Sequence, residues 1–177
     1  YTKTRYSILT LSLQRLINTH KDFRDLLLFI SLLDSQNILR DLLDKYKNNL
    51  VVDNFIYNLK KYSLIIDKSS LASLDPTISV HRSTQAITLD YLKKLLGLVK
   101  DKKIIQPISL ILSNYITRSS DKENLFKMKL LLNHYETFLS HSHLLTSSMK
   151  GSIGTELGSI YFSIGNYKKA KDILEKS

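Results

Sequence analysis

Residues 48–66 read NNLVVDNFIYNLKKYSLII, and their pattern changes from helical to strand-like near Tyr62. Before that point, apolar side chains recur at three- and four-residue spacing, which predicts a helix over 50–62. After it, 63–67 is short and rich in β-branched residues, and 77–81 alternates apolar with polar side chains. Such segments are typical of strands. The sequence therefore predicts a helix followed by two strands.

Helical periodicity continues on both sides of this segment. The segment 22–33 is apolar around most of its circumference, so we expect a central helix there. Lys100 to Lys103 are expected to close the helix before them, since cations are favoured at the negative end of a helix dipole. The chain is predicted to be mainly α. The remaining predicted helices lie at 6–17, at 38–46 with Asn37 as its cap, and at 83–99, 105–116, 123–145, 150–164 and 167–176, with a linker at 146–148.

The composition is that of a folded protein, with 43% hydrophobic and 24% charged residues. The absence of cysteine excludes disulfides, thiolate metal sites and cysteine nucleophiles, and it suits a reducing compartment. The longest charge-free run, 104–117, is shorter than the roughly 18 apolar residues that a membrane-spanning helix needs. We therefore expect a cytoplasmic chain with no membrane span. Because it begins with Tyr1 and enters a helical pattern at once, we interpret it as an excised piece.

The net charge of +10 raises the question of a nucleic-acid partner. The basic residues are scattered pairs and form no run of five or six like charges, so a solvated surface accounts for most of them. The helix at 50–62 carries residues that can contact bases and phosphates, although Asp53 lies among them. A DNA-binding regulator is thus an alternative, ranked second. Its contact residues would be Asn54, Tyr57, Asn58, Lys60 and Lys61.

Three helices, a fourth helix and a two-stranded hairpin follow one another in the order of a winged helix, in which the hairpin is the wing. Two segments, FIYNLKKYSLI at 55–65 and ISVHRSTQA at 78–86, also resemble a known family. It is similar to the winged-helix segment that ends the NB-ARC module of STAND signalling ATPases, especially bacterial members followed by tetratricopeptide repeats. The resemblance covers roughly residues 6–97.

The resemblance implies a role for His81. In the family, a Met-His-Asp-like motif closes the second wing strand, and its His contacts the β-phosphate of bound ADP. Here Val80 takes the Met position and Arg82 stands where many members have Asp, so the role of that acidic residue does not carry over. The chain has no phosphate-binding loop of the Gly-x-x-x-x-Gly-Lys-Ser/Thr type. We therefore expect no cofactor, little affinity for ADP and no catalysis here, while ADP or ATP and an upstream nucleotide-binding domain of the same chain belong to the intact protein.

A second resemblance covers 151–177, which is similar to a tetratricopeptide repeat (TPR) that stops near its end, with Gly154 in place of the usual Trp. Small residues at matching positions would let two antiparallel helices approach closely. Because a single repeat cannot bury its faces, the array is expected to continue after Ser177 and to bind a protein partner. The residues expected to pack the repeat are Leu157, Gly158, Tyr161, Gly165, Tyr167, Ala170 and Leu174.

Other chemistries find little support in the sequence. His134, His141 and His143 lack the spacing and the neighbouring carboxylates of a metal site, and no nucleophile elbow or paired-carboxylate motif occurs. The leading hypothesis is a regulatory, non-catalytic fragment of a STAND-type ATPase. A plain TPR interaction scaffold is a further alternative. The predicted segments are an N-terminal helix at 1–20, a winged-helix domain at 21–103, a helical hairpin connector at 104–147 and the first TPR-like repeat at 148–177.

Overall fold

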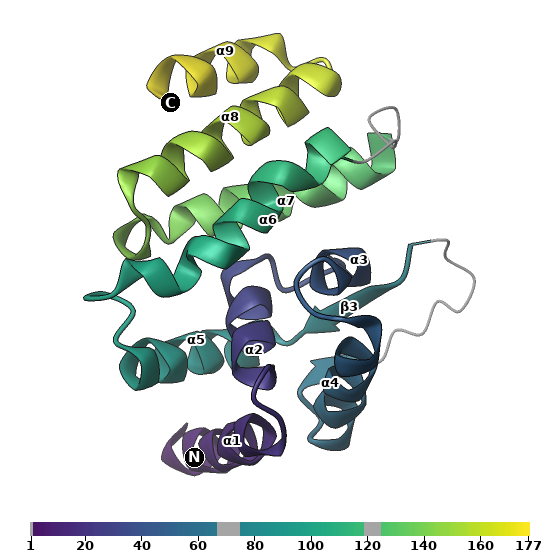
Figure 1. Ribbon diagram of the computed structural model, residues 1–177, viewed down its shortest axis with the longest axis vertical. Coiled ribbons are helices and arrows are strands. Elements are labelled where there is room, and N and C mark those ends of the chain that lie inside the picture. The colour runs from purple at the N-terminus through teal and green to yellow at the C-terminus, as the bar shows by residue number, and fades with distance from the viewer. Residues whose placement is uncertain (1, 67–74, 119–124) are drawn as a thin grey trace. The chain divides into compact units, whose positions relative to one another are not determined.

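The computed structural model describes residues 2–66, 75–118 and 125–177 (Figure 1). The chain divides into two compact units, an N-terminal unit of Tyr1–Gly97 and a C-terminal unit of Leu98–Ser177. Both are mainly helical, as predicted, and the N-terminal unit also contains a small antiparallel sheet. None of the described helices is both long and apolar enough to cross a lipid bilayer.

The N-terminal unit has α2 (Phe23–Leu32) at its centre, and every residue of this helix except Arg24 and Asp25 is buried. This confirms the central helix predicted from its apolar circumference. Helices α1 (Thr2–Thr19) and α5 (Arg82–Leu96) both pack against it. The amide of Gln85 in α5 donates to the carbonyl oxygens of Ile30 and Leu33, at 2.9 and 2.6 Å, and thereby pairs acceptors at the end of α2.

The sheet has the strand order β1-β3-β2 and is antiparallel throughout. The two predicted strands are present as β2 (Ile65–Ile66) and β3 (Thr77–Val80), with Ile65 opposite Val80. The edge strand β1 (Ile38–Leu39) was not predicted, and it pairs with β3 where the sequence indicated the start of a helix.

The prediction that Asn37 caps a helix was wrong. Asn37 has a positive φ of 54°, a conformation that asparagine tolerates better than most residues, and it turns the chain into β1. Its backbone N–H donates to the Ser79 hydroxyl of β3 at 3.0 Å. The helix α3 (Arg40–Asp44) follows only after this strand, so the pairing of β1 with β3 overrides the local helical pattern.

Helix α4 (Asn49–Lys61) runs where the helix at 50–62 was predicted. The side chain of Asn48 caps its start by accepting a hydrogen bond from the Val51 N–H at 3.0 Å. At its end the N–H groups of Ser63 and Leu64 donate to the carbonyls of Lys60 and Leu59. Ser63 takes a left-handed conformation with φ 54°, the position that glycine usually fills, and the chain turns sharply into β2.

The C-terminal unit begins just after Gly97, whose φ of 60° ends α5 in a left-handed cap. The prediction that Lys100 to Lys103 close this helix was wrong, because the helix stops earlier at a residue that takes this conformation at little cost. The unit consists of the 3₁₀ turn η1 (Lys102–Ile105), α6 (Gln106–Arg118), α7 (Leu125–Ser140), the 3₁₀ turn η2 (Ser142–Leu144), α8 (Ser147–Ser163) and α9 (Tyr167–Lys176).

The predicted linker at 146–148 is instead the start of α8. The hydroxyl of Thr146 accepts a hydrogen bond from the Met149 N–H at 3.3 Å, so Thr146 is the helix cap, and Ser147 and Ser148 lie in the first turn. Serine and threonine are common both in loops and at helix caps, so composition alone did not separate the two. The start of the helix predicted at 123–145 lies outside the described residues.

Candidate functional site

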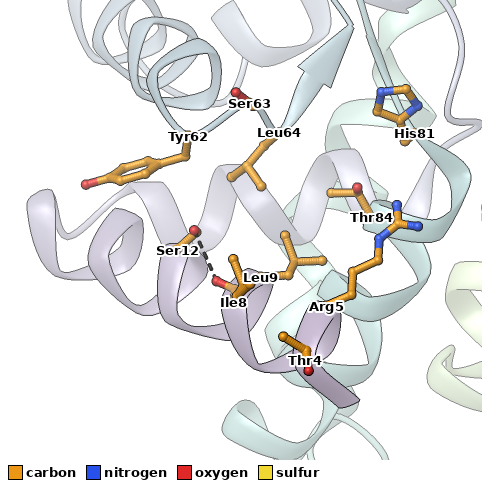
Figure 2. Close-up of a pocket in the computed structure, with 10 residues that line it drawn as sticks. All are labelled: Thr4, Arg5, Ile8, Leu9, Ser12, Tyr62, Ser63, Leu64, His81 and Thr84. Carbon is orange, nitrogen blue, oxygen red and sulfur yellow. Dashed lines mark hydrogen bonds between the residues drawn. The ribbon is translucent and has the colours of Figure 1, made fainter. Parts of the chain in front are cut away.

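A pocket of about 440 Å³ lies within the N-terminal unit (Figure 2). Three parts of the unit line it: α1, the connection from α4 to β2, and the junction between β3 and α5. All three are described and belong to the same compact unit. The lining residues are Thr4, Arg5, Ile8, Leu9, Ser12, Tyr62, Ser63, Leu64, His81 and Thr84.

Helix α1 forms one wall of the pocket. Its five lining residues recur at three- and four-residue spacing, which places them on one face of the helix. Ile8 and Leu9 supply the apolar part of this wall, while Arg5 extends toward the junction of β3 and α5. Ser12 donates its hydroxyl proton to the carbonyl of Ile8 at 3.2 Å, so it pairs within its own helix.

The register of the sheet brings the other two walls together. Because β2 and β3 are antiparallel with Ile65 opposite Val80, the residues before β2 lie beside the residue after β3. Leu64 and His81 therefore meet at one edge of the hairpin. Figure 2 shows His81, Thr84 and Arg5 at one end of the pocket, Tyr62 at the other, and apolar side chains between them.

His81 is exposed and occupies the N-cap position of α5. Its side chain makes no capping hydrogen bond, and the first turn of α5 contains no acidic residue. The carbonyl of His81 accepts from the Gln85 N–H at 2.9 Å, but the N–H groups of Arg82, Ser83 and Thr84 have no acceptor among the described residues. The positive end of this helix dipole is thus open toward the pocket.

Cationic side chains surround this helix start. Arg5 donates to the hydroxyl of Ser83 at 2.8 Å, across 78 residues of sequence. Neither Arg5 nor Arg82 forms a salt bridge with a described residue. Arginine in the first turn of a helix is unfavourable, because the helix dipole already makes that end positive. The arrangement can bind an anion, with backbone N–H groups and guanidinium groups as donors.

The residues named for DNA contact lie on α4, but they do not share one exposed face. Asn54, Tyr57, Lys60 and Lys61 are exposed, whereas Asn58 is buried and donates its amide to the Asn54 carbonyl at 2.8 Å. Asp53 is 59% exposed and pairs with Arg40 at 2.5 Å, so a carboxylate lies on the same helix surface.

The residues named for repeat packing lie in α8, in α9 and in the turn between these helices. Four are buried and three are exposed, among them Tyr167 at 63% and Leu174 at 45%. The close approach is between Gly158 and Leu174: a Cβ atom on Gly158 would lie 2.6 Å from the Leu174 Cγ. Gly165 has φ 84° and ends α8, as expected for a left-handed cap. The buried members are Leu157, Gly158, Tyr161 and Ala170.

Comparisons of this chain with protein-family models, with curated proteins and with solved structures found no match. Within the described ranges, no three histidine, cysteine or acidic side chains gather as a metal site would require. Sequence reasoning named His81 but missed Arg5 and Thr84. A signal was present for the helix start itself, since His81-Arg82 precedes a helical pattern without a nearby acidic residue. Nothing local indicated Arg5, whose contact with α5 is tertiary.

Proposed function

We propose that this chain is a regulatory, non-catalytic part of a STAND-type ATPase switch. In this proposal the N-terminal unit contains a winged helix whose wing is formed by β2 and β3, and α8 with α9 begins a TPR region. The observation that carries the proposal is the position of His81. It follows β3 directly, lines a pocket and stands at an open helix start where an anion is favoured.

The proposed mechanism depends on a contact between His81 and the nucleotide that differs between the ADP and ATP states. In the intact protein, an upstream nucleotide-binding domain holds ADP, and His81 contacts its phosphate and keeps the winged helix docked. Exchange of ADP for ATP removes this contact and releases the winged helix for assembly. A nucleotide shifts such an equilibrium only if it contacts the two states unequally, so the contact must exist in the ADP state alone.

The TPR part of the proposal is supported by the tight contact of α8 with α9. Gly158 leaves space for Leu174. The ring centroids of Phe162 and Tyr167 lie 5.2 Å apart, and both side chains are exposed. Exposed aromatic side chains on a helical hairpin suit either a following repeat or a protein partner. The plain scaffold alternative keeps this role and drops the nucleotide.

The winged-helix DNA-binding alternative has less support. Of the five residues named on α4, Asn58 is buried, and the exposed carboxylate of Asp53 on the same helix would repel the phosphates of a duplex. We therefore rank DNA binding below the switch, and we expect membrane binding to have no part in the function.

The test uses the full-length gene product. We expect the purified protein to retain ADP, and His81→Ala to increase the ADP dissociation rate by about tenfold or more, since a hydrogen bond to a charged group contributes about 1.5–3 kcal/mol. The rate is measured by release of a fluorescent ADP analogue. His20→Ala, a change at a histidine on another segment of the same unit, is the control. An unchanged dissociation rate in His81→Ala would remove His81 from the mechanism.

A further inference from the structure

We propose that the outer side of α4 is a docking surface for a protein partner that presents apolar side chains with acidic side chains at one end. We call this surface the α4 face and define it by Leu50, Asn54, Tyr57, Lys60 and Lys61. It shares no residue with the pocket described above. The inference therefore goes beyond the proposed switch and does not depend on a nucleotide.

The first argument concerns two large apolar side chains that α4 exposes. The core side of this helix carries Val52, Phe55 and Leu59, all of which are buried. Leu50 and Tyr57 are 74% and 65% exposed, and among the described large apolar side chains of the N-terminal unit they are the most exposed. They are seven residues apart, so they share one side of the helix at a separation of two turns, about 10 Å along the axis.

These two side chains have the character of interface anchors. Tyrosine is one of the residues that contribute most to binding when a partner covers them, and leucine supplies apolar area beside it. Asn54 lies between Leu50 and Tyr57 on the same side of α4, and its side-chain amide forms no hydrogen bond with a described residue. A partner would thus cover two apolar anchors around one group that can donate and accept hydrogen bonds.

The second argument, charge complementarity, selects the kind of partner. Lys60 and Lys61 are exposed at the C-terminal end of the α4 face. The nearby carboxylate of Asp53 is paired with the Arg40 guanidinium at 2.5 Å, so its charge is balanced by another residue of the unit. The α4 face is therefore apolar along its length and positive at one end. Acidic side chains at the matching end of a partner would be attracted to it, whereas basic ones would be repelled.

Two other occupants fit this face less well. In a two-fold pair of the chain with Leu50 against Tyr57, the lysines of each α4 would lie beside the start of the other α4, which the helix dipole makes positive. A DNA duplex would gain nothing from the leucine, which has no hydrogen-bonding group, and its phosphates would be repelled by Asp53. A protein partner can use both the apolar side chains and the lysines.

The test uses a display library of short random peptides as the probe. The library is enriched on the chain of residues 1–177 and depleted of peptides that also bind the double variant Leu50→Ser with Tyr57→Ser. We expect the enriched peptides to combine apolar residues with an excess of Asp and Glu, and to bind the unchanged chain with a dissociation constant on the order of 10 μM. Addition of such a peptide should shift the backbone amide resonances of α4.

Two control variants separate the α4 face from the rest of the surface. Leu11→Ser with Leu95→Ser, at exposed positions of α1 and α5, should leave peptide binding unchanged. Lys60→Glu with Lys61→Glu should weaken it at least about fivefold, because two attractive charges become repulsive. The same change of net charge at exposed positions of α1, Lys3→Glu with Arg15→Glu, should weaken it by less than about twofold.

Three results would overturn the proposal. The first is a library in which no peptide survives the depletion step, or in which the survivors carry no acidic excess. The second is an equal loss of binding in the two charge variants, which would indicate general attraction to a basic protein. The third is a dimer of the chain, seen by sedimentation, that Leu50→Ser with Tyr57→Ser dissociates, because the face would then be occupied by a second copy.

Discussion

The α8–α9 hairpin and the β3–α5 junction differ in how completely their polar and apolar groups are paired. In the hairpin, Thr146 caps α8, Asn166 caps α9, and Leu174 fills the space above Gly158. At the junction, α5 begins without a cap, and Thr84 has no partner for its hydroxyl among the described residues. In the hairpin, both helix starts are therefore capped and the space beside Gly158 is filled. The junction leaves the donors of a helix start without a partner in the described residues, so water must satisfy them.

The largest effect is expected where the packing is closest. Gly158→Leu should destabilise the hairpin by about 1–3 kcal/mol, because the larger side chain must displace Leu174. Faster amide exchange over 150–177, with unchanged exchange in the N-terminal unit, would show that the damage is local.

Two controls separate packing from helix propensity. At Gly151, in the same helix, an added Cβ would have no neighbour within 4 Å, so Gly151→Leu should be neutral or stabilising. Gly158→Ala needs only a shift of the Leu174 side chain, which is 45% exposed, and its gain in propensity of up to about 1 kcal/mol offsets the crowding. Equal tolerance of leucine at Gly158 and Gly151 would contradict the close contact and remove the support for a TPR.

A smaller effect on stability is expected when the cap of α8 is removed and a cap is added to α5. Thr146→Ala removes the cap of α8 and should cost about 1 kcal/mol of unfolding free energy. His81→Asp adds a cap and a negative charge to α5 and should stabilise the N-terminal unit by about 0.5–1 kcal/mol. Chemical denaturation followed at each unit measures both changes. In the full-length protein His81→Asp should also weaken the retention of ADP, because a carboxylate would then face the phosphate that the proposed switch places there.

His81→Asn serves as the control for this exchange, because it supplies a cap without a charge. It should stabilise α5 less than Asp does. Destabilisation by both substitutions would mean that the imidazole of His81 makes a contact that a cap cannot replace, and the view of α5 as an open helix start would then be wrong.

The sequence predicted the helices well because their periodicity is a local signal. It missed β1 because a two-residue strand has no period, and the decisive contacts come from Ile78 and Ser79, about 40 residues away. It also extended α5 to Val99 by following apolar spacing past Gly97, where the left-handed cap ends the helix.

The candidate site was predictable only in part, for the same reason. His81 was named through a resemblance, and the uncapped start of α5 can be seen in the residues themselves. The contribution of Arg5 could not be predicted, since it depends on the packing of α1 against α5, which brings residues 78 positions apart into contact. Likewise, the burial of Asn58 follows from its hydrogen bond within α4 and from tertiary packing, not from its polarity.

The smallest effect is expected for nucleic acid, and it tests whether the cations of the N-terminal unit act together or at one place. Lys60→Glu with Lys61→Glu reverses two exposed charges at the end of α4 that do not line the pocket. We expect weak binding of duplex DNA that falls steeply with salt and does not depend on sequence, because scattered surface cations act through the phosphate backbone. The double substitution should reduce this binding modestly. Titration of labelled duplexes of different sequence at two salt concentrations measures this effect, and Lys93→Glu with Lys94→Glu, at a half-buried and an exposed position of α5, provides the control. A salt-resistant preference for one duplex that is lost only when Lys60 and Lys61 are changed would rank the DNA-binding alternative above the switch, because specific readout requires base contacts that a diffuse positive surface does not make.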